Sequence, residues 1–475
     1  TAGLFRLWIE RVFTIAGFGT VLSGIPTSGQ AQVGDKLRIV PGGQVGRVRG
    51  LEVYGRKADV GRAGQCVAVN LADIDYDALR RGEVLCHAEA FEPVRMVEAE
   101  LQLLPGVRQP LKDYAEVHLH VGTAEAMANV AMLEAHPLLP GERQMVQLRV
   151  QEPLGIAPGD RFVIRAGMPG VAGGGVTTIG GGRVLGTSDR RLRRNRPWTL
   201  ASLAARRDAI DSPRAWCELN LKEAAEAISA AALARRAQMP ADRVEALLEE
   251  LAGEGVALKA AARAFAHRDV VDDLAGGLAD ALAEYHAANP DRAGMEESEL
   301  HAGAGVGRAL FDLALAKLAA DGAIERRGPL VWRAGRSVKL SPEDREVCGR
   351  IESTLQAAGL AAPRPAELAE SLGVDPKRLA ALIRLLADQG VLAELDPKVV
   401  LHRKAVEAAK KVAIDLFARQ GSFETVEFRD ALGVSRKYAV PLLDYFDTIR
   451  LTVRSGSRRT PGAVAKDILA GKQTL

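Results

Sequence analysis

The stretch Leu372-Gly-Val-Asp-Pro-Lys-Arg-Leu-Ala-Ala-Leu-Ile-Arg-Leu-Leu-Ala-Asp-Gln-Gly390 decides the fold of the second half of the chain, because versions of it recur. Related stretches occupy Met239–Gly255, Val306–Gly322 and Leu432–Phe446, at intervals of roughly 60 to 70 residues. Each predicts a short helix, a turn and a second helix with an apolar stripe, and a β-like tail follows. A helix-turn-helix followed by a two-stranded wing is a winged helix, so we predict four of them in tandem.

The first 187 residues have a different pattern, in which Val, Ile and Thr alternate with polar residues between Gly and Pro. Strands are predicted, for example, at Leu37–Val40, Glu116–Val121, Met145–Val150 and Arg161–Arg165. Many short strands with frequent turns indicate barrels or sandwiches, and Glu92-Pro93 marks the junction between two of them. Near Trp198 the composition shifts to Ala, Leu, Glu and Arg, which predicts the major domain boundary at residues 188–198.

These patterns predict two β-barrels followed by four tandem α/β winged-helix domains. The predicted ranges are 1–91 and 92–187 for the barrels, 188–270 for the first winged helix with a basic linker, and 271–337, 338–404 and 405–475 for the others.

The composition limits the classes of protein to which the chain can belong. The chain has 475 residues, 47% hydrophobic and 26% charged, as in globular proteins, and no apolar run suited to spanning a bilayer. The net charge of +3 is small, but residues 183–207 hold eight arginines and one acid, and residues 448–475 hold six basic residues and one acid. Such stretches suit a polyanion partner, although a solvated linker and tail would also explain them.

The four cysteines are far apart and form no Cys-x-x-Cys pair. We therefore expect neither a disulfide framework nor a metal site, and we expect a reducing, cytoplasmic location.

Several stretches together resemble one family. Phe13–Gly24 is similar to the domain-2 signature of translational GTPases. Phe5–Phe13 and Val48–Gly55 resemble the domain 2 of selenocysteine-specific translation elongation factors (SelB). Thr178–Leu185 resembles their domain 3, and Ser435–Leu443 resembles their last winged helix. The resemblance implies barrels of the domain-2 and domain-3 type, a role in selenocysteine incorporation, and a monomer whose partners are selenocysteyl-tRNA, an mRNA hairpin and the ribosome.

The GTPase domain of that family is absent from these residues, because no G-x-x-x-x-G-K-[ST] loop occurs among them. The Gly-rich segment Gly170–Gly175 lacks the following Lys and Ser or Thr, so we interpret it as a loop between strands. GTP and Mg²⁺, the family's cofactors, are expected in the missing domain. We therefore expect no catalysis and no cofactor in this chain.

The resemblance also implies an aminoacyl-tRNA site at Glu10, Arg11 and Cys66. The family usually has a basic residue where Cys66 stands, after a Gly-Gln pair. A selenolate in a partly desolvated pocket favours nearby cations, so Arg11 is the candidate cation and Cys66 weakens the charge pattern.

The last winged helix is the predicted mRNA-binding domain. Proteins read duplex RNA mostly through its loops, bulges and backbone, which a helix N-terminus and a basic wing can reach. The candidate residues are Arg429, Ser435, Arg436, Lys437 and Tyr438 around the recognition helix, and Arg454, Arg458 and Arg459 on the wing. Tyr438 is equally consistent with stacking on a base and with packing in the core. The first two winged helices lack such basic residues and are interpreted as spacers.

Two other functions fit parts of the sequence. Tandem winged helices also occur in DNA-binding regulators, where the barrels would be a sensor module and the protein a symmetric dimer. A scaffold that binds RNA without acting in translation is the third hypothesis.

Overall fold

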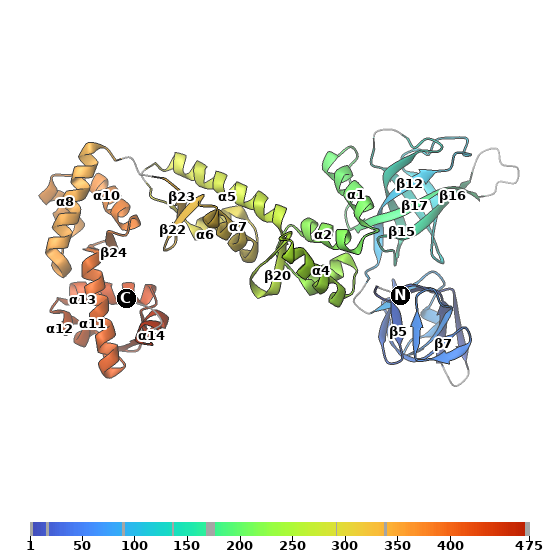
Figure 1. Cartoon of the computed structure of the whole chain (residues 1–475), viewed down its shortest axis with the longest axis horizontal. Helices are drawn as coiled ribbons and strands as arrows, with labels where there is room; N and C mark the ends of the chain where they lie inside the picture. Colours follow the sequence, from blue (N-terminus) through green and yellow to red (C-terminus); the bar gives the residue numbers. More distant parts are fainter. Residues whose placement is uncertain are drawn as a thin grey trace. The chain divides into compact units, whose positions relative to one another are not determined.

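The computed structural model describes residues 3–15, 19–87, 91–134, 137–167, 176–290, 292–336 and 340–470 (Figure 1). Two compact units are present, Thr1–Asp272 and Asp273–Leu475. Part of the domain-2 signature, residues 16–18, and the segment 170–175 that was interpreted as a loop lie outside the described residues.

The first barrel is a nine-stranded antiparallel sheet with a separate two-stranded ribbon, β5–β9. Its main path runs in the order β2-β3-β10-β7-β6-β11-β1-β4, with β8 paired to β7. The strands are β1 (Arg6–Trp8), β2 (Arg11–Ile15), β3 (Gly19–Gly24), β4 (Pro26–Ser28), β5 (Gln30–Gln32), β6 (Lys36–Val40), β7 (Val45–Val53), β8 (Arg56–Ala58), β9 (Val60–Arg62), β10 (Val67–Ala72) and β11 (Val84–His87). Alternating buried Val, Leu and Ile fill its core.

The second barrel is closed, in the order β12-β15-β14-β13-β16-β17. Its strands are β12 (Val94–Leu103), β13 (Ala115–Val121), β14 (Ala124–Met132), β15 (Arg143–Leu154), β16 (Arg161–Gly167) and β17 (Val176–Ser188). The four strands predicted from alternation are thus confirmed, as β6, β13, β15 and β16. Gly182 in β17 meets its neighbour so closely that a Cβ there would lie 1.9 Å from the carbonyl oxygen of Glu100.

A buried arginine joins the two barrels. Arg6 is 3% exposed, forms an ion pair with Asp160, and places its guanidinium 5.5 Å from the ring centre of Trp8 and 5.6 Å from that of Phe91. Trp8 also packs against Gly122, where a Cβ would lie 2.3 Å from its ring. Charge pairing and close packing together hold the barrels as one body.

Four winged helices follow the barrels, so the predicted fold class is confirmed. The first winged helix consists of α2 (Pro213–Ala224), β18 (Ile228–Ser229), α3 (Ala230–Ala237), α4 (Ala241–Gly253), β19 (Ala257–Lys259) and β20 (Ala264–His267). The second consists of α5 (Arg268–Ala288), β21 (Met295–Glu296), α6 (Glu297–Ala304), α7 (Arg308–Ala320), β22 (Ile324–Arg327) and β23 (Leu330–Arg333), and the third of α8 (Pro342–Ala358), α9 (Pro365–Leu372), α10 (Pro376–Asp388), β24 (Leu392–Asp396) and β25 (Val399–His402). The last consists of α11 (Arg403–Gln420), β26 (Phe423–Glu424), α12 (Thr425–Leu432), α13 (Arg436–Thr448), β27 (Thr452–Ser455), β28 (Arg458–Pro461) and α14 (Ala463–Leu469).

The third winged helix departs from the others because its sheet has two strands instead of three. In the other three copies a short strand between the first two helices pairs with the wing. Here Pro363 and Pro365 stand at that place in the sequence. Proline has no backbone N–H to donate to a neighbouring strand, so the pairing is lost.

Helix α1 (Pro197–Ala209) precedes the first winged helix and packs against both the second barrel and α2. Its Leu203 is buried in a cluster with Leu133, Met145 and Leu185, all from the barrel segment. The composition shift near Trp198 therefore marks the change from strand to helix, whereas the first winged helix proper begins at Pro213.

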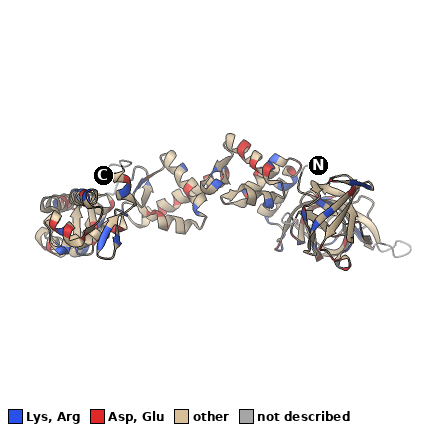
Figure 2. Ribbon diagram, turned by 90° about the horizontal axis from the view of Figure 1, so that it is seen from below, with Lys and Arg blue, Asp and Glu red and all other residues tan. Residues whose placement is uncertain are grey.

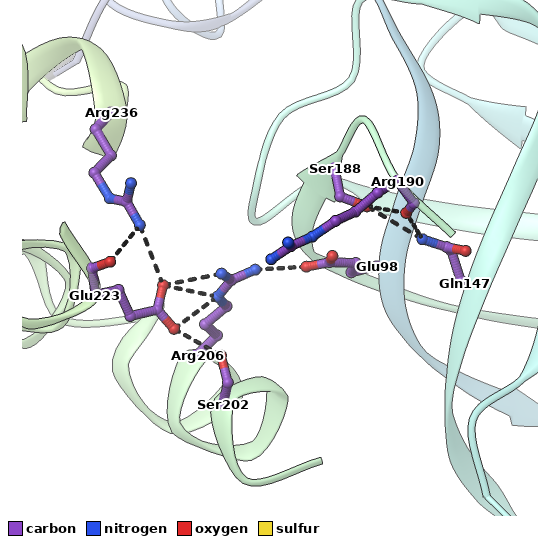
Figure 3. A network of polar contacts seen from close by, with 8 residues as sticks. All are labelled: Glu98, Gln147, Ser188, Arg190, Ser202, Arg206, Glu223 and Arg236. Carbon is purple, nitrogen blue, oxygen red and sulfur yellow. Dashed lines mark hydrogen bonds and ion pairs between the residues drawn. The ribbon is translucent and has the colours of Figure 1, made fainter. Parts of the chain in front are cut away.

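A polar network fastens α1 and α2 to the barrel (Figure 3). Arg206 of α1 lies between Glu98 of β12, at 2.5 Å, and Glu223 of α2, at 2.9 Å. Burial lowers the pKa of Arg206, but the hydrogen bonds and charges of Glu223 and Glu98 outweigh it and raise the pKa above its ordinary value. Gly186 leaves the necessary room, since a Cβ there would lie 2.3 Å from Nη1 of Arg206.

In the part of the chain that the structure describes, none of the helices combines the length and the apolar character needed to span a membrane.

Candidate nucleic-acid interfaces

The outer face of the first barrel carries the predicted aminoacyl site. Arg11 of β2 lies opposite Ser23 of β3, and Ser23 lies opposite Ala68 of β10. Directly opposed residues in antiparallel strands point to the same side of the sheet, so these three share one face. Glu10 precedes β2, is exposed, and donates its backbone N–H to the carbonyl of Ser23 at 2.9 Å.

Cys66 lies near this face. It is a free, exposed thiol immediately before β10, in which Ala68 and Asn70 alternate with buried Val67 and Val69. The alternation places Cys66 on the side of Ala68, and β2 is two strand spacings from β10, roughly 10 Å. The fold thus brings Cys66 to the region of Glu10 and Arg11, although it stands far from them in the sequence.

A groove of about 570 Å³ continues this face. Its floor comes from β2, β3, β7 and β10, and its lining residues are Phe13, Val21, Val33, Arg49, Gly50, Leu51, Glu52, Lys57, Ala58, Asp59, Ala68 and Asn70. Phe13 is 37% exposed, as expected for an apolar side chain on the wall of an open groove. The combination of apolar walls with a few charged groups is typical of a ligand-binding site.

Sequence reasoning missed two cations of this groove, Arg49 and Lys57. Arg49 was within a stretch that carried the family resemblance, but nothing in the local pattern indicated that β7 and β8 bring both side chains to the groove wall. Only the pairing of distant strands shows this.

In the last winged helix, α12 and α13 are joined by a turn at Gly433, whose φ of +65° favours glycine. Arg436 and Lys437 form the exposed first turn of α13 after Ser435, whose side chain makes no cap hydrogen bond. The positive end of a helix dipole and two cations at one place favour an anion such as phosphate.

Tyr438 is half-buried and packs against the apolar core of the two last winged helices. Its hydroxyl donates a hydrogen bond of 2.9 Å to the carbonyl of Ala362 in the third winged helix. Nζ of Lys437 lies 4.8 Å from the centre of the Tyr438 ring. These contacts favour the packing interpretation of Tyr438 over base stacking.

The wing arginines differ from one another. Arg454 of β27 is exposed. Arg458 hydrogen-bonds the hydroxyl of Ser422 at 3.0 Å and lies 3.6 Å from Glu427, so part of its hydrogen-bonding capacity is already used within the protein. Arg429, on α12, forms an ion pair of 2.5 Å with the neighbouring Asp430.

Arg459 is the least accessible of these arginines, at 5% exposed. It is paired with Asp444 at 2.9 Å and Asp447 at 3.3 Å, and bonds Thr425 at 3.2 Å. Its burial and ion pairs argue against the phosphate-binding role assigned to it from the sequence, because β28 points this side chain toward α12 and α13. Arg454, Arg436 and Lys437 are the more accessible cations.

Basic and acidic residues are interspersed over both units and form no single charged face in the view of Figure 2. RNA contact would therefore depend on local clusters and not on the overall charge.

Family models match four segments of the chain. Residues 19–86 match "Elongation factor Tu domain 2", and residues 98–191 match "Selenocysteine-specific elongation factor, beta-barrel domain". Residues 279–331 and 415–460 each match "Elongation factor SelB, winged helix".

Longer relatives extend this agreement to nearly the whole chain. The selenocysteine-specific elongation factor of Desulfomicrobium baculatum is 32% identical over 462 residues, which are 96% of this chain and 71% of that protein. The factor of the same name from Escherichia coli (strain K12) is 28% identical over 468 residues, 95% of this chain and 70% of that protein. A crystal structure of bacterial selenocysteine-specific elongation factor EF-Sec has a TM-score of 0.51 at 18% identity, covering 97% of this chain and 69% of that one, and shares its fold.

Proposed function

This chain belongs to the selenocysteine-specific elongation factor family, and from that membership we propose that it binds selenocysteyl-tRNA through its barrels and an mRNA hairpin through its last winged helix. The observation that carries the proposal is the pair Arg436–Lys437, exposed at the N-terminus of α13 within the segment that matches a SelB winged helix. The ribosome is the third proposed partner. We assign the 475 residues of this chain a role in recognition, since no phosphate-binding loop motif occurs among them.

The aminoacyl end of the tRNA would lie along the groove of the first barrel. Selenocysteine is a selenolate at neutral pH, whereas serine is uncharged, so a cation distinguishes the two. Arg11 supplies that cation on the outer face, and Glu10 next to it would orient the amino group. Cys66, on the same face, contributes no positive charge.

Replacing Cys66 with arginine should therefore sharpen the discrimination. Hydrogen bonds to a charged partner contribute about 1.5 to 3 kcal/mol, so Cys66→Arg should raise the preference for selenocysteyl-tRNA over seryl-tRNA roughly tenfold or more. The measurement is protection of each aminoacyl ester against hydrolysis, with the protein supplied with a GTP-bound GTPase domain. Cys66→Ser, which adds no charge, is the matched control. An unchanged preference in Cys66→Arg would show that position 66 does not face the aminoacyl group.

The hairpin site is tested by removing its two exposed cations. Each phosphate contact contributes about 0.7 to 0.9 to the slope of log affinity against log salt, so Arg436→Ala with Lys437→Ala should lower the magnitude of that slope by roughly 1.4 to 1.8. The loss should be greater for the cognate hairpin than for a plain duplex of equal length. Filter binding at several salt concentrations measures both.

Lys411→Ala with Arg419→Ala is the control, because both residues are exposed on α11 of the same domain and the net charge changes equally. If this control lowers the slope as much as the Arg436 and Lys437 variant, the proposed site is incorrect. An intact chain without any preference for the hairpin would contradict the proposal as a whole.

A further inference from the structure

The arginine-rich linker between the second barrel and α1 is built onto the barrel surface. Gln147 of β15 is fully buried, and its amide donates to the carbonyl of Arg190 at 2.9 Å and accepts from the backbone N–H of Leu192 at 3.2 Å. Further along, Asn195 donates its N–H to the carbonyl of Leu133 at 2.9 Å, and Arg194 forms an ion pair with Asp113. The linker therefore has a defined path, in contrast to a solvated chain.

This anchoring divides the side chains of the linker. Leu192 packs inward against the apolar cluster of α1 and the barrel, and Arg194 is held by Asp113. Arg191 and Arg193 are exposed, and neither forms an ion pair with any residue that the structure describes. Since residues 189–196 contain five arginines and one aspartate, the exposed side of the linker is strongly basic.

Two exposed aromatic rings belong to the surroundings of this basic segment. Trp198 at the start of α1 is 67% exposed, with the guanidinium of Arg196 5.4 Å from its ring centre. Tyr114 is 55% exposed, with the guanidinium of Arg149 5.0 Å from its ring centre. Arg149 also bonds Gln147 at 3.1 Å, and Tyr114 adjoins the Asp113 that holds Arg194. Connected polar contacts thus join the Arg149–Tyr114 pair to the linker, and the Arg196–Trp198 pair follows the linker directly in the sequence.

We propose that the linker, together with Trp198 and Tyr114, is an RNA-binding surface that grips phosphates with Arg191 and Arg193 and stacks unpaired bases on the aromatic rings. Exposed aromatic rings together with exposed arginines suit single-stranded RNA, because every base has a face to stack and every nucleotide has a phosphate. An acidic protein surface would use the arginines but would gain little from the exposed indole. This surface shares no residue with the first-barrel groove or with the proposed hairpin site of the last winged helix, and its function does not depend on either.

Trp198 makes the proposal directly testable. Among the four tryptophans, Trp8 is buried and Trp216 and Trp332 are half-buried, so Trp198 is the one that a bound base can reach. The full chain, carrying Arg436→Ala and Lys437→Ala to suppress binding by the last winged helix, is titrated with a 12-nucleotide oligouridylate and with a blunt RNA duplex. We expect the oligouridylate to quench tryptophan fluorescence and the duplex to quench it much less.

Substitutions distinguish the contribution of base stacking to RNA binding from the contribution of charge. Trp198→Phe should keep the affinity, measured by anisotropy of labelled oligouridylate, and lose the quenching, whereas Trp198→Ala should weaken binding about fivefold or more. Arg191→Ala with Arg193→Ala should lower the magnitude of the salt slope by about 1.4, for two single-strand contacts. All these side chains are exposed, and thermal unfolding followed by circular dichroism verifies that each variant folds.

The control is Arg235→Ala with Arg243→Ala, two exposed arginines of the first winged helix whose loss changes the net charge equally. The proposal is overturned if this control lowers the salt slope as much as the linker variant. It is also overturned if the duplex quenches as strongly as the single strand, or if oligouridylate does not bind. Failure of the hairpin experiment above would leave the quenching by oligouridylate unchanged, so the two proposals fail separately.

Discussion

Replacing Arg206 with methionine is expected to lower the unfolding free energy of the second barrel and its docked helices by about 3 kcal/mol. The reason is the carboxylate left behind. Glu98 has 6% of its side chain exposed, and Arg206 is its ion-pair partner at 2.5 Å. Without the guanidinium, the charge of Glu98 stays in a water-poor site uncompensated, and Glu223 of α2 loses the same partner.

The protection of backbone amides in β12, β17 and α1 against hydrogen exchange measures this loss locally, which a single melting curve of a multidomain chain does not. Arg207→Met is the matched control. Arg207 neighbours Arg206 and pairs with Asp208 at 2.9 Å, but 44% of its side chain is exposed, so its loss should cost less than about 1 kcal/mol.

A second variant separates buried charge from lost contact. Glu98→Gln combined with Arg206→Met removes both charges, so it should regain part of the stability lost in Arg206→Met alone. If Arg206→Met is as stable as the parent, the network does not contribute to holding α1 and α2 on the barrel.

Replacing Gly182 with alanine should prevent the second barrel from closing normally, at a cost of about 3 kcal/mol or more. The added Cβ would lie 1.9 Å from the carbonyl oxygen of Glu100 and 2.9 Å from Cζ of Phe162. Glu100 is on the paired strand β12, so relief requires the strands to separate and their hydrogen bonds to lengthen. The expected observation is a lower midpoint of urea unfolding, or protein recovered only in aggregates.

Gly167→Ala provides the comparison, because a Cβ at this end of β16 meets no atom within 4 Å. It should change the stability by less than about 0.5 kcal/mol. Equal midpoints for Gly182→Ala and Gly167→Ala would contradict the close approach of β17 to β12.

The repeated helix-turn-helix stretches and the alternating strands were predicted from the sequence because both depend on neighbours within a few residues. Apolar residues at helical spacing define a buried helix face, and alternation defines a buried strand face, wherever the element is placed. Gly182 lies in the stretch Thr178–Leu185, which resembles domain 3 of the SelB family. The structure shows why a larger residue does not fit there.

Whether an individual charged side chain is exposed or buried in an ion pair could not be predicted in this way. From the sequence, Arg454 and Arg459 were equivalent wing cations, but one is exposed and the other is buried between Asp444 and Asp447. Tyr438 was undecided between stacking and packing until its hydroxyl was found bonded to Ala362, 76 residues away.

Sequence alone therefore determined which elements form, their order and the family to which they point, because those properties follow from local periodicity and from motifs in succession. Tertiary structure alone decided which cations are free and which are paired. It brought Glu98 to Arg206 across 108 residues of chain, and it anchored the arginine linker through Gln147. The physical reason is that an ion pair or a hydrogen bond of a buried amide requires two groups within about 3 Å of each other. Which distant groups meet at that distance depends on the fold and cannot be determined from the local sequence.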